Sequence, residues 1–115
     1  MSSALQIAIR REPAAAVIEL HGDVNSDGEA AVTGAYDDLT ATGASTVLLD
    51  LSRAQYINTS GISVLITVAM AAKKAGIVVL VSGASPHYKK VFDLVRFSSF
   101  VTMFETEAEA LHSLT

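Results

Sequence analysis

The stretch LDLSRAQYINTSGI, residues 49–62, joins an apolar strand to an amphipathic helix. The apolar run at residues 47–51 predicts the strand, and the polar loop after it leads into a helix that starts near Ser60 and Gly61. At the start of a helix the first backbone N–H groups lack intrahelical partners and the helix dipole is positive. A hydroxyl group at such a position can carry or receive an anionic phosphate.

Strands and helices alternate along the rest of the chain. Alternating or continuous apolar runs predict strands at residues 5–10, 15–21, 46–51, 77–81 and 101–104. Capping residues and C-terminal glycines predict helices at residues 26–42, 60–75, 85–96 and from 106 onward. The order predicts a single α/β domain over residues 1–115, with a mixed, mostly parallel sheet of four to five strands and about four helices.

The composition narrows the classes of function. The 115 residues are 50% hydrophobic, which excludes a disordered chain, and the net charge of −4 provides no basic footprint for direct nucleic-acid binding. The chain has no cysteine, its three histidines have no metal-ligand spacing, and no nucleotide-binding fingerprint is found. The longest apolar run, residues 62–72, is too short to span a bilayer. We therefore expect a cytoplasmic protein without membrane insertion, bound metal or cofactor.

The helix at residues 60–75 has one apolar side and one weakly polar side. At 100° per residue, Ile62, Leu65, Ile66, Ala69 and Ala72 cluster on the side predicted to face the sheet. The other side is predicted to consist of small or weakly polar residues: Ser60, Val64, Thr67, Ala71 and Lys74, flanked by Ser63 and Met70. Helix faces exposed only to water usually carry many charges, so this side suits close approach by another protein. The alternative is that another part of the same chain covers it.

Residues 49–66, LDLSRAQYINTSGISVLI, resemble the phospho-acceptor loop of the STAS domain, the anti-sigma factor antagonist family. In the family pattern, a strand ending in Asp-Leu-Ser leads through a short loop to Asp-Ser/Thr-Ser-Gly and an apolar helix. The acceptor serine directly precedes the glycine, so it maps onto Ser60. Residues 19–25, ELHGDVN, resemble the second loop of the family, and the resemblance extends from about residue 5 to residue 112.

The resemblance implies a role in bacterial partner switching. An unphosphorylated STAS antagonist binds an anti-sigma factor that is also a serine kinase, phosphorylation of the serine releases it, and a serine phosphatase reverses the modification. By this resemblance Ser60 is the phosphorylation site and no residue is catalytic. The residues expected to bind the partner surround it: Asp23, Asn25, Asn58, Thr59, Gly61, Ser63, Val64, Thr67 and Met70.

Two residues depart from the family pattern. Asn58 and Asn25 stand where the family usually has aspartate, and each keeps a short hydrogen-bonding side chain that can cap a helix but lacks the negative charge. This leaves an alternative, a non-phosphorylated STAS subunit that regulates a transporter or acts as a scaffold in a signalling complex. The neighbouring genes would distinguish the two functions: a gene for a kinase or a sigma factor favours partner switching, whereas genes for transporter subunits favour the alternative.

Two further interpretations stay open at the level of the sequence. Ser60 can be simply the N-cap of its helix, and Asp23 can be simply a turn residue. A small enzyme is a third functional class, but no Gly-x-Ser-x-Gly elbow surrounds Ser60, and no paired carboxylate and histidine are placed to activate it.

Overall fold

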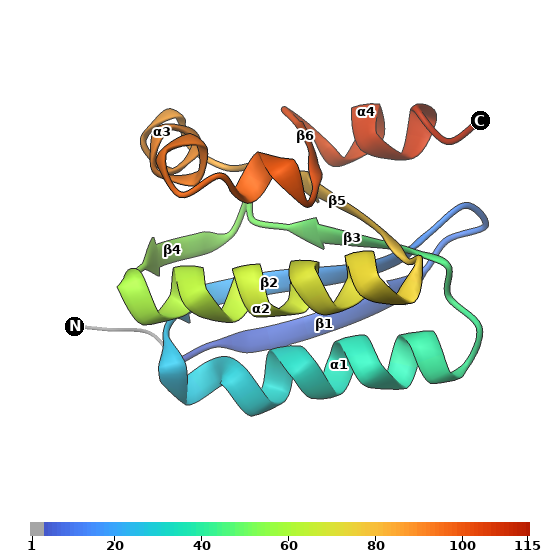
Figure 1. The fold of residues 1–115 in the computed structure, drawn as a ribbon, viewed down its shortest axis with the longest axis horizontal. Coiled ribbons are helices and arrows are strands. Elements are labelled where there is room, and N and C mark those ends of the chain that lie inside the picture. Colours follow the sequence, from blue (N-terminus) through green and yellow to red (C-terminus); the bar gives the residue numbers. More distant parts are fainter. Residues whose placement is uncertain (1–3) are drawn as a thin grey trace.

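A mixed β-sheet runs through the middle of the molecule, with helices on both sides (Figure 1). The computed structural model describes residues 4–115, so the first three residues of the predicted domain lie outside the described part. The strands in this part are β1 (Gln6–Arg11), β2 (Ala16–Val24), β3 (Thr46–Asp50), β4 (Ala54–Ile57), β5 (Val78–Ser82) and β6 (Thr102–Phe104). The helices are α1 (Glu29–Ala41), α2 (Thr59–Ala75), α3 (Pro86–Leu94) and α4 (Glu107–His112), with short 3₁₀ turns η1 (Ser26–Gly28) and η2 (Phe97–Ser99).

The strand order is β1-β2-β3-β5-β6, and β4 pairs with β2 outside this path. Only the β1–β2 hairpin is antiparallel among the strand pairs of residues 4–115; β2–β3, β2–β4, β3–β5 and β5–β6 are parallel. The predicted α/β architecture with a largely parallel sheet is therefore confirmed. Parallel strands place their carboxyl ends at one edge of the sheet, and this edge holds the loops that concern function.

The two faces of the sheet are covered unequally. Helices α1 and α2 pack on one face, where Ile18, Leu20 and Leu49 of the sheet are fully buried together with Val32 and Leu65 of the helices. The six-residue α4 covers part of the opposite face through Ala110, which packs with three buried sheet residues, Val17, Leu48 and Leu80. Within residues 4–115, no helix combines the length and the apolar character needed to cross a membrane.

Strand β4 is the element that the sequence did not predict, because residues 52–58 were expected to form a loop. β3 pairs with the first half of β2 and β4 with its last three residues, so the two short strands follow each other along the same side of β2. The register shifts between Gly22 and Asp23, where the chain passes from one pairing to the other. A strand of four residues, stabilised by a distant partner, leaves almost no periodic signal in the sequence.

Two helix starts agree with the predicted caps, whereas the predicted start at Ser26 is a 3₁₀ turn and α1 begins at Glu29. Ser85 accepts a hydrogen bond from Tyr88 N, and Thr106 accepts one from Glu109 N. Gly76 ends α2 in the left-handed conformation with φ of 75°. Helix α3 ends at Leu94, two residues before the predicted end, because Arg96 also has a left-handed backbone, with φ of 61°.

Candidate functional site

Two loops leave the sheet side by side, one after β2 and one after β4. The two strands are parallel, and Val24 and Ile57 are in register at their ends. The loops are joined directly, since Asn58 N donates a hydrogen bond of 3.2 Å to the Val24 carbonyl oxygen. In Figure 1 the start of α2 and the start of η1 lie at the same end of the molecule. The sequence predicted a site in the second of these loops and, by the family resemblance, expected Asp23 and Asn25 of the first loop beside it; the structure places the two loops next to each other.

The hydroxyl group of Ser60 lies between the two loops and bonds to both. Ser60 Oγ donates a hydrogen bond of 2.8 Å to Asn58 Oδ1 and accepts one of 3.0 Å from Ser26 N. Ser60 is the second residue of α2 and is partly buried. Asn58 is the N-cap residue, and its Oδ1 also accepts a hydrogen bond of 2.8 Å from Gly61 N. The interpretation of Ser60 as the N-cap is therefore wrong, because the helix begins one residue earlier than predicted.

Gly61 permits the close approach of α2 to the loop after β2. It is buried, and a Cβ atom at this position would overlap the Val24 carbonyl oxygen and lie 2.6 Å from the Val24 carbonyl carbon. Contacts of this length to backbone atoms are essentially absent from proteins, so only glycine fits. The loops can share the Ser60 hydroxyl because residue 61 has no side chain.

The two asparagines that depart from the STAS pattern have the same structural role. Asn58 caps α2, and Asn25 caps η1, where its Oδ1 accepts a hydrogen bond of 2.9 Å from Asp27 N. The expectation that both side chains can cap helices is confirmed. An amide oxygen accepts an N–H as a carboxylate does, but it adds no negative charge beside Ser60.

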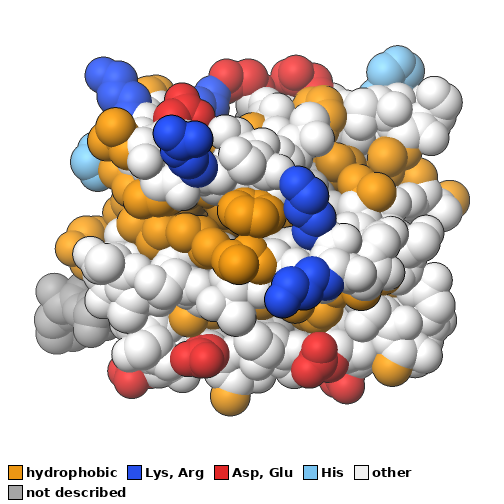
Figure 2. All heavy atoms as spheres, in the orientation of Figure 1, with side chains coloured by type: hydrophobic (Ala, Val, Ile, Leu, Met, Phe, Trp, Pro, Cys, Tyr) orange, Lys and Arg blue, Asp and Glu red, His pale blue; other side chains and the backbone are white. Residues whose placement is uncertain are grey.

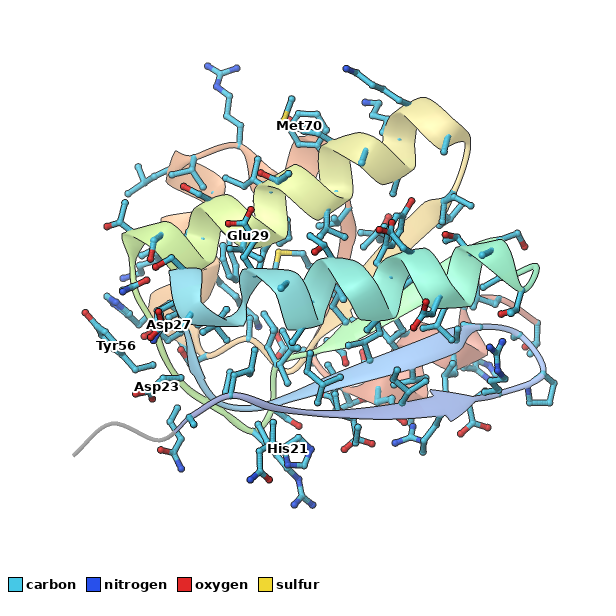
Figure 3. All side chains as sticks on the ribbon, turned by 90° about the horizontal axis from the view of Figure 1, so that it is seen from below. His21, Asp23, Asp27, Glu29, Tyr56 and Met70 are labelled. Carbon is cyan, nitrogen blue, oxygen red and sulfur yellow. The ribbon has the colours of Figure 1, made fainter. Side chains whose placement is uncertain are left out.

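The acidic and aromatic residues at this end of the molecule differ in their exposure. Asp23 is only 8% exposed at the end of β2, whereas Tyr56, its register partner on β4, is 59% exposed. Asp27 and Glu29 are exposed at the start of η1 and α1. Figure 3 shows Tyr56 projecting outward beside Asp23 and Asp27. Tyr56 was not among the predicted site residues; an aromatic residue within AQYI is a weak strand signal that could have pointed to it.

The outward face of α2 is partly as predicted. Thr59, Ser63, Thr67 and Met70 are exposed, and Met70 points away from α1 and β1 (Figure 3). The hydroxyls of Ser63 and Thr67 donate hydrogen bonds to the carbonyl groups one turn earlier, at Thr59 and Ser63. Their polar groups are thus satisfied within the helix, and the outward surface is less polar than its composition suggests.

The prediction that Val64 lies on the outward face of α2 is wrong. Only 4% of its surface is exposed, and it belongs to the core. The contact of Gly61 with Val24 turns α2 so that its buried positions are Gly61, Val64, Leu65, Val68, Ala69 and Ala72. Ile62 and Ile66, which were predicted to face the sheet, are only partly buried at the side of this face. Burial also leaves Asp23 and Gly61 little surface with which to contact a partner.

Helix α3 holds the end of β4 next to the site. The backbone N–H of Ile57 donates a hydrogen bond of 2.8 Å to the Tyr88 hydroxyl oxygen, which fixes the end of β4 immediately before Asn58. This link between residues 31 positions apart had no sequence signal.

Residues 4–115 contain no group of three or more His, Cys, Asp or Glu side chains that could hold a metal ion.

Known proteins were compared with the chain in three ways. The sequence model of the family described as "Mlab, STAS domain" matches residues 7–103. A comparison with curated protein sequences finds no significant match. Among solved structures, the fold is similar to that of an anti-sigma factor antagonist from Mycobacterium paratuberculosis, with 15% identity and a TM-score of 0.82, covering 99% of this chain and 98% of the other.

Two structures of SpoIIAA show the same fold. The anti-sigma factor antagonist SpoIIAA in its unphosphorylated form has 19% identity and a TM-score of 0.72, with 96% of each chain covered. The Bacillus cell fate determinant SpoIIAA in its phosphorylated form has 18% identity and a TM-score of 0.73, covering 97% of this chain and all of the other. These identities are low, so the structural comparisons establish the fold. The family model spans most of the sequence, and the chain belongs to the STAS domain family.

Proposed function

We propose that this STAS domain is an anti-sigma factor antagonist that binds an anti-sigma factor with serine kinase activity, and that phosphorylation of Ser60 releases it. The observation that carries the proposal is the place of the Ser60 hydroxyl, which joins two surface loops at the N-terminus of α2. A group at this junction can change the surface that both loops present without any change in the core.

The chemistry of a phosphate at Ser60 supports release rather than unfolding. Phosphorylation replaces the hydroxyl proton, so the hydrogen bond donated to Asn58 Oδ1 is lost, while phosphate oxygens can still accept from Ser26 N. The dianion lies at the positive end of the α2 dipole, where it is tolerated. On the surface it adds about −1.5 to −2 charges at the hydrogen-bond partner of Ser26, next to the exposed carboxylate of Asp27. A partner that packs on this surface must then bury an unpaired charge.

The exposed residues around Ser60 provide the contact surface. Tyr56 is an aromatic side chain at the end of β4, and aromatic residues often anchor protein interfaces. Thr59, Ser63, Thr67 and Met70 extend this surface along α2 with small or flexible side chains. In this proposal Asn25 and Asn58 hold the two loops in place, and a serine phosphatase restores the binding form.

Mass spectrometry of the chain purified from its native host tests the modification. We expect one phosphate per chain in the fraction that does not co-purify with the partner, and peptide mapping should place it on Ser60. A stoichiometric phosphate on Thr59 or Ser63 would contradict the assignment to Ser60. Ser60→Ala, expressed in the same host, should carry no phosphate and should stay bound to the partner.

A second candidate is a STAS subunit that regulates a transporter or signalling complex without being phosphorylated. The observation that favours it is the neutral Asn58, whose Oδ1 already accepts from both Ser60 Oγ and Gly61 N, in place of a carboxylate. This candidate predicts a chain without phosphate under all growth conditions that still co-purifies stoichiometrically with its partner.

A further inference from the structure

A second surface, on the other side of α2 from α1, carries exposed apolar residues. Leu94 is 83% exposed and Val95 is 43% exposed at the end of α3, and Met70 is 43% exposed on α2. Ile66 and Phe100 pack against the core but are only partly buried. We call these five residues the α2–α3 patch. A leucine exposed to this degree, beside other apolar side chains, is typical of a binding surface.

The two halves of the patch are held together by Lys73. Its Nζ donates a hydrogen bond of 3.2 Å to the Ser99 carbonyl oxygen and lies 5.4 Å from the centroid of the Phe100 ring. The segment that follows α3 is therefore fixed beside the second half of α2. In Figure 2, hydrophobic side chains gather between α2 and this segment, with Lys and Arg side chains along both sides.

The positive charge around the patch runs against the charge of the chain as a whole. The net charge is −4, yet Lys73, Lys74 and Arg96, three of its eight Lys and Arg residues, lie at the end of α2 and directly after α3. Of the other charged residues on α3, Lys89 pairs with Glu105, and Asp93 is exposed beside Lys90. Within residues 4–115, the Arg96 side chain makes no hydrogen bond or ion pair. Arg96 also has a left-handed backbone, with φ of 61°, which glycine would adopt at lower energy. A free guanidinium at a strained position, directly after two exposed aliphatic residues, is consistent with a binding role.

We propose that the α2–α3 patch binds an amphipathic helix of a partner protein whose large apolar side chains are flanked by carboxylates. The apolar side chains cover Met70, Leu94 and Val95, and the carboxylates pair with Lys73 and Arg96 at the two sides. A helix that lies across the surface of the patch can cover these apolar side chains and present carboxylates to Lys73 and Arg96. The patch shares Met70 with the surface proposed around Ser60, but Leu94, Val95 and Arg96 lie at the end of α3, so binding here does not require phosphorylation of Ser60.

A second copy of this chain fits the patch less well. The exposed residues beside the carboxylates of its acidic helix α1 are the alanines at positions 30, 31 and 41, which are too small to cover the patch. Helix α4 also carries two glutamates, but it has only six residues, and Ala110 and Leu111 pack against its own sheet. An anionic membrane fits less well too, because the acidic residues of α1 face the same side as the patch (Figure 2). A flat anionic surface would meet these carboxylates, whereas a helix lying along the patch would not.

Chemical-shift mapping tests the proposal with a defined probe. The full-length ¹⁵N-labelled chain is titrated with a capped peptide of repeating Glu-Leu-Leu-Glu, and separately with its counterpart in which every glutamate is lysine. We expect the acidic peptide to shift the amide signals of residues 66–74 and 90–100, and the lysine peptide to bind at least about tenfold more weakly. No shift at these residues with excess acidic peptide, or equal binding of both peptides, would overturn the proposal.

Matched variants distinguish binding of the peptide at the patch from nonspecific binding. Leu94→Glu and Arg96→Glu should each weaken binding of the acidic peptide about tenfold. Ile9→Glu and Arg53→Glu change an exposed aliphatic and an exposed cation elsewhere, and should leave the affinity within about twofold. Ser60→Glu should also leave it unchanged. Equal losses in Leu94→Glu and Ile9→Glu would refute the site. If the chain does not bind the acidic peptide but self-associates in a Leu94-dependent way, the occupant of the patch is a second copy and not a partner helix. If it instead binds phosphatidylglycerol vesicles in a Leu94-dependent way, the occupant is a membrane.

Discussion

Replacing Gly61 by alanine should destabilise the protein, although alanine is the better helix former. A Cβ atom at residue 61 would lie 2.6 Å from the Val24 carbonyl carbon and 3.2 Å from Asn25 N. Ordinary contacts begin at 3.4 Å, so the start of α2 must move away from the loop after β2 by at least 0.8 Å, the difference between 2.6 and 3.4 Å. The neighbours are backbone atoms of a buried strand end, which cannot move aside as a flexible side chain can.

The expected change in the free energy of unfolding of Gly61→Ala is the sum of opposing contributions. Alanine gains up to about 1 kcal/mol over glycine inside a helix. Overpacking a buried site costs about 1–3 kcal/mol. The displacement also weakens two hydrogen bonds between the loops, Asn58 N to Val24 O and Ser26 N to Ser60 Oγ, each contributing about 1 kcal/mol. We expect the free energy of unfolding to fall by about 2–3 kcal/mol, which lowers the urea midpoint by roughly 1–2 M.

Gly34→Ala provides the matched control for this measurement. Gly34 also lies within a helix, but a Cβ atom there would have no neighbour within 4 Å. The control should raise the free energy of unfolding by about 0.5–1 kcal/mol. The two variants should therefore shift the urea midpoint in opposite directions. Equal shifts, or a stabilised Gly61→Ala variant, would refute the close contact between α2 and the loop after β2.

Three further substitutions test other parts of the structure. Arg96→Gly should raise the free energy of unfolding by about 0.5–1 kcal/mol in urea denaturation, because glycine relieves the left-handed strain. Asn58→Ala should lower it by about 1–2 kcal/mol, since it removes the cap of α2. Burial and a hydrogen bond with Asp50 raise the pKa of Glu107, so stability should fall as pH rises from about 4.3 through the folded-state pKa. Glu107→Gln should flatten that decline in denaturation curves recorded across this range.

The alternation of strands and helices was predictable because its signals are local. The buried strands β3 and β5 are continuous apolar runs, and the caps Ser85 and Thr106 stand beside the helices that they begin. The place of the candidate site followed from the same pattern, since a polar loop after a central parallel strand lies at the carboxyl edge of the sheet. Both kinds of signal are contained within a few neighbouring residues.

The details of the site depend on contacts between distant segments. The helical period alone placed Val64 on the outward face, but the contact of Gly61 with Val24 turns α2 and buries it. The bond from Ser26 N to Ser60 Oγ spans 34 positions, and nothing near either residue signals it. The exposure of Tyr56 depends on the pairing of β4 with the end of β2, which no local pattern specifies.

Binding measurements on position 60 test the central claim most directly. The partner that co-purifies with the wild-type chain is titrated by calorimetry with wild type, Ser60→Ala and Ser60→Asp. Ser60→Ala should bind about as well as wild type, because it adds no charge and the two hydrogen bonds that it loses, from Ser26 N and to Asn58 Oδ1, lie within the chain and not across the interface. Ser60→Asp should bind about tenfold more weakly or worse, since an unpaired carboxylate must be buried in the interface. Equal affinities of all three chains would contradict the claim that charge at Ser60 controls binding.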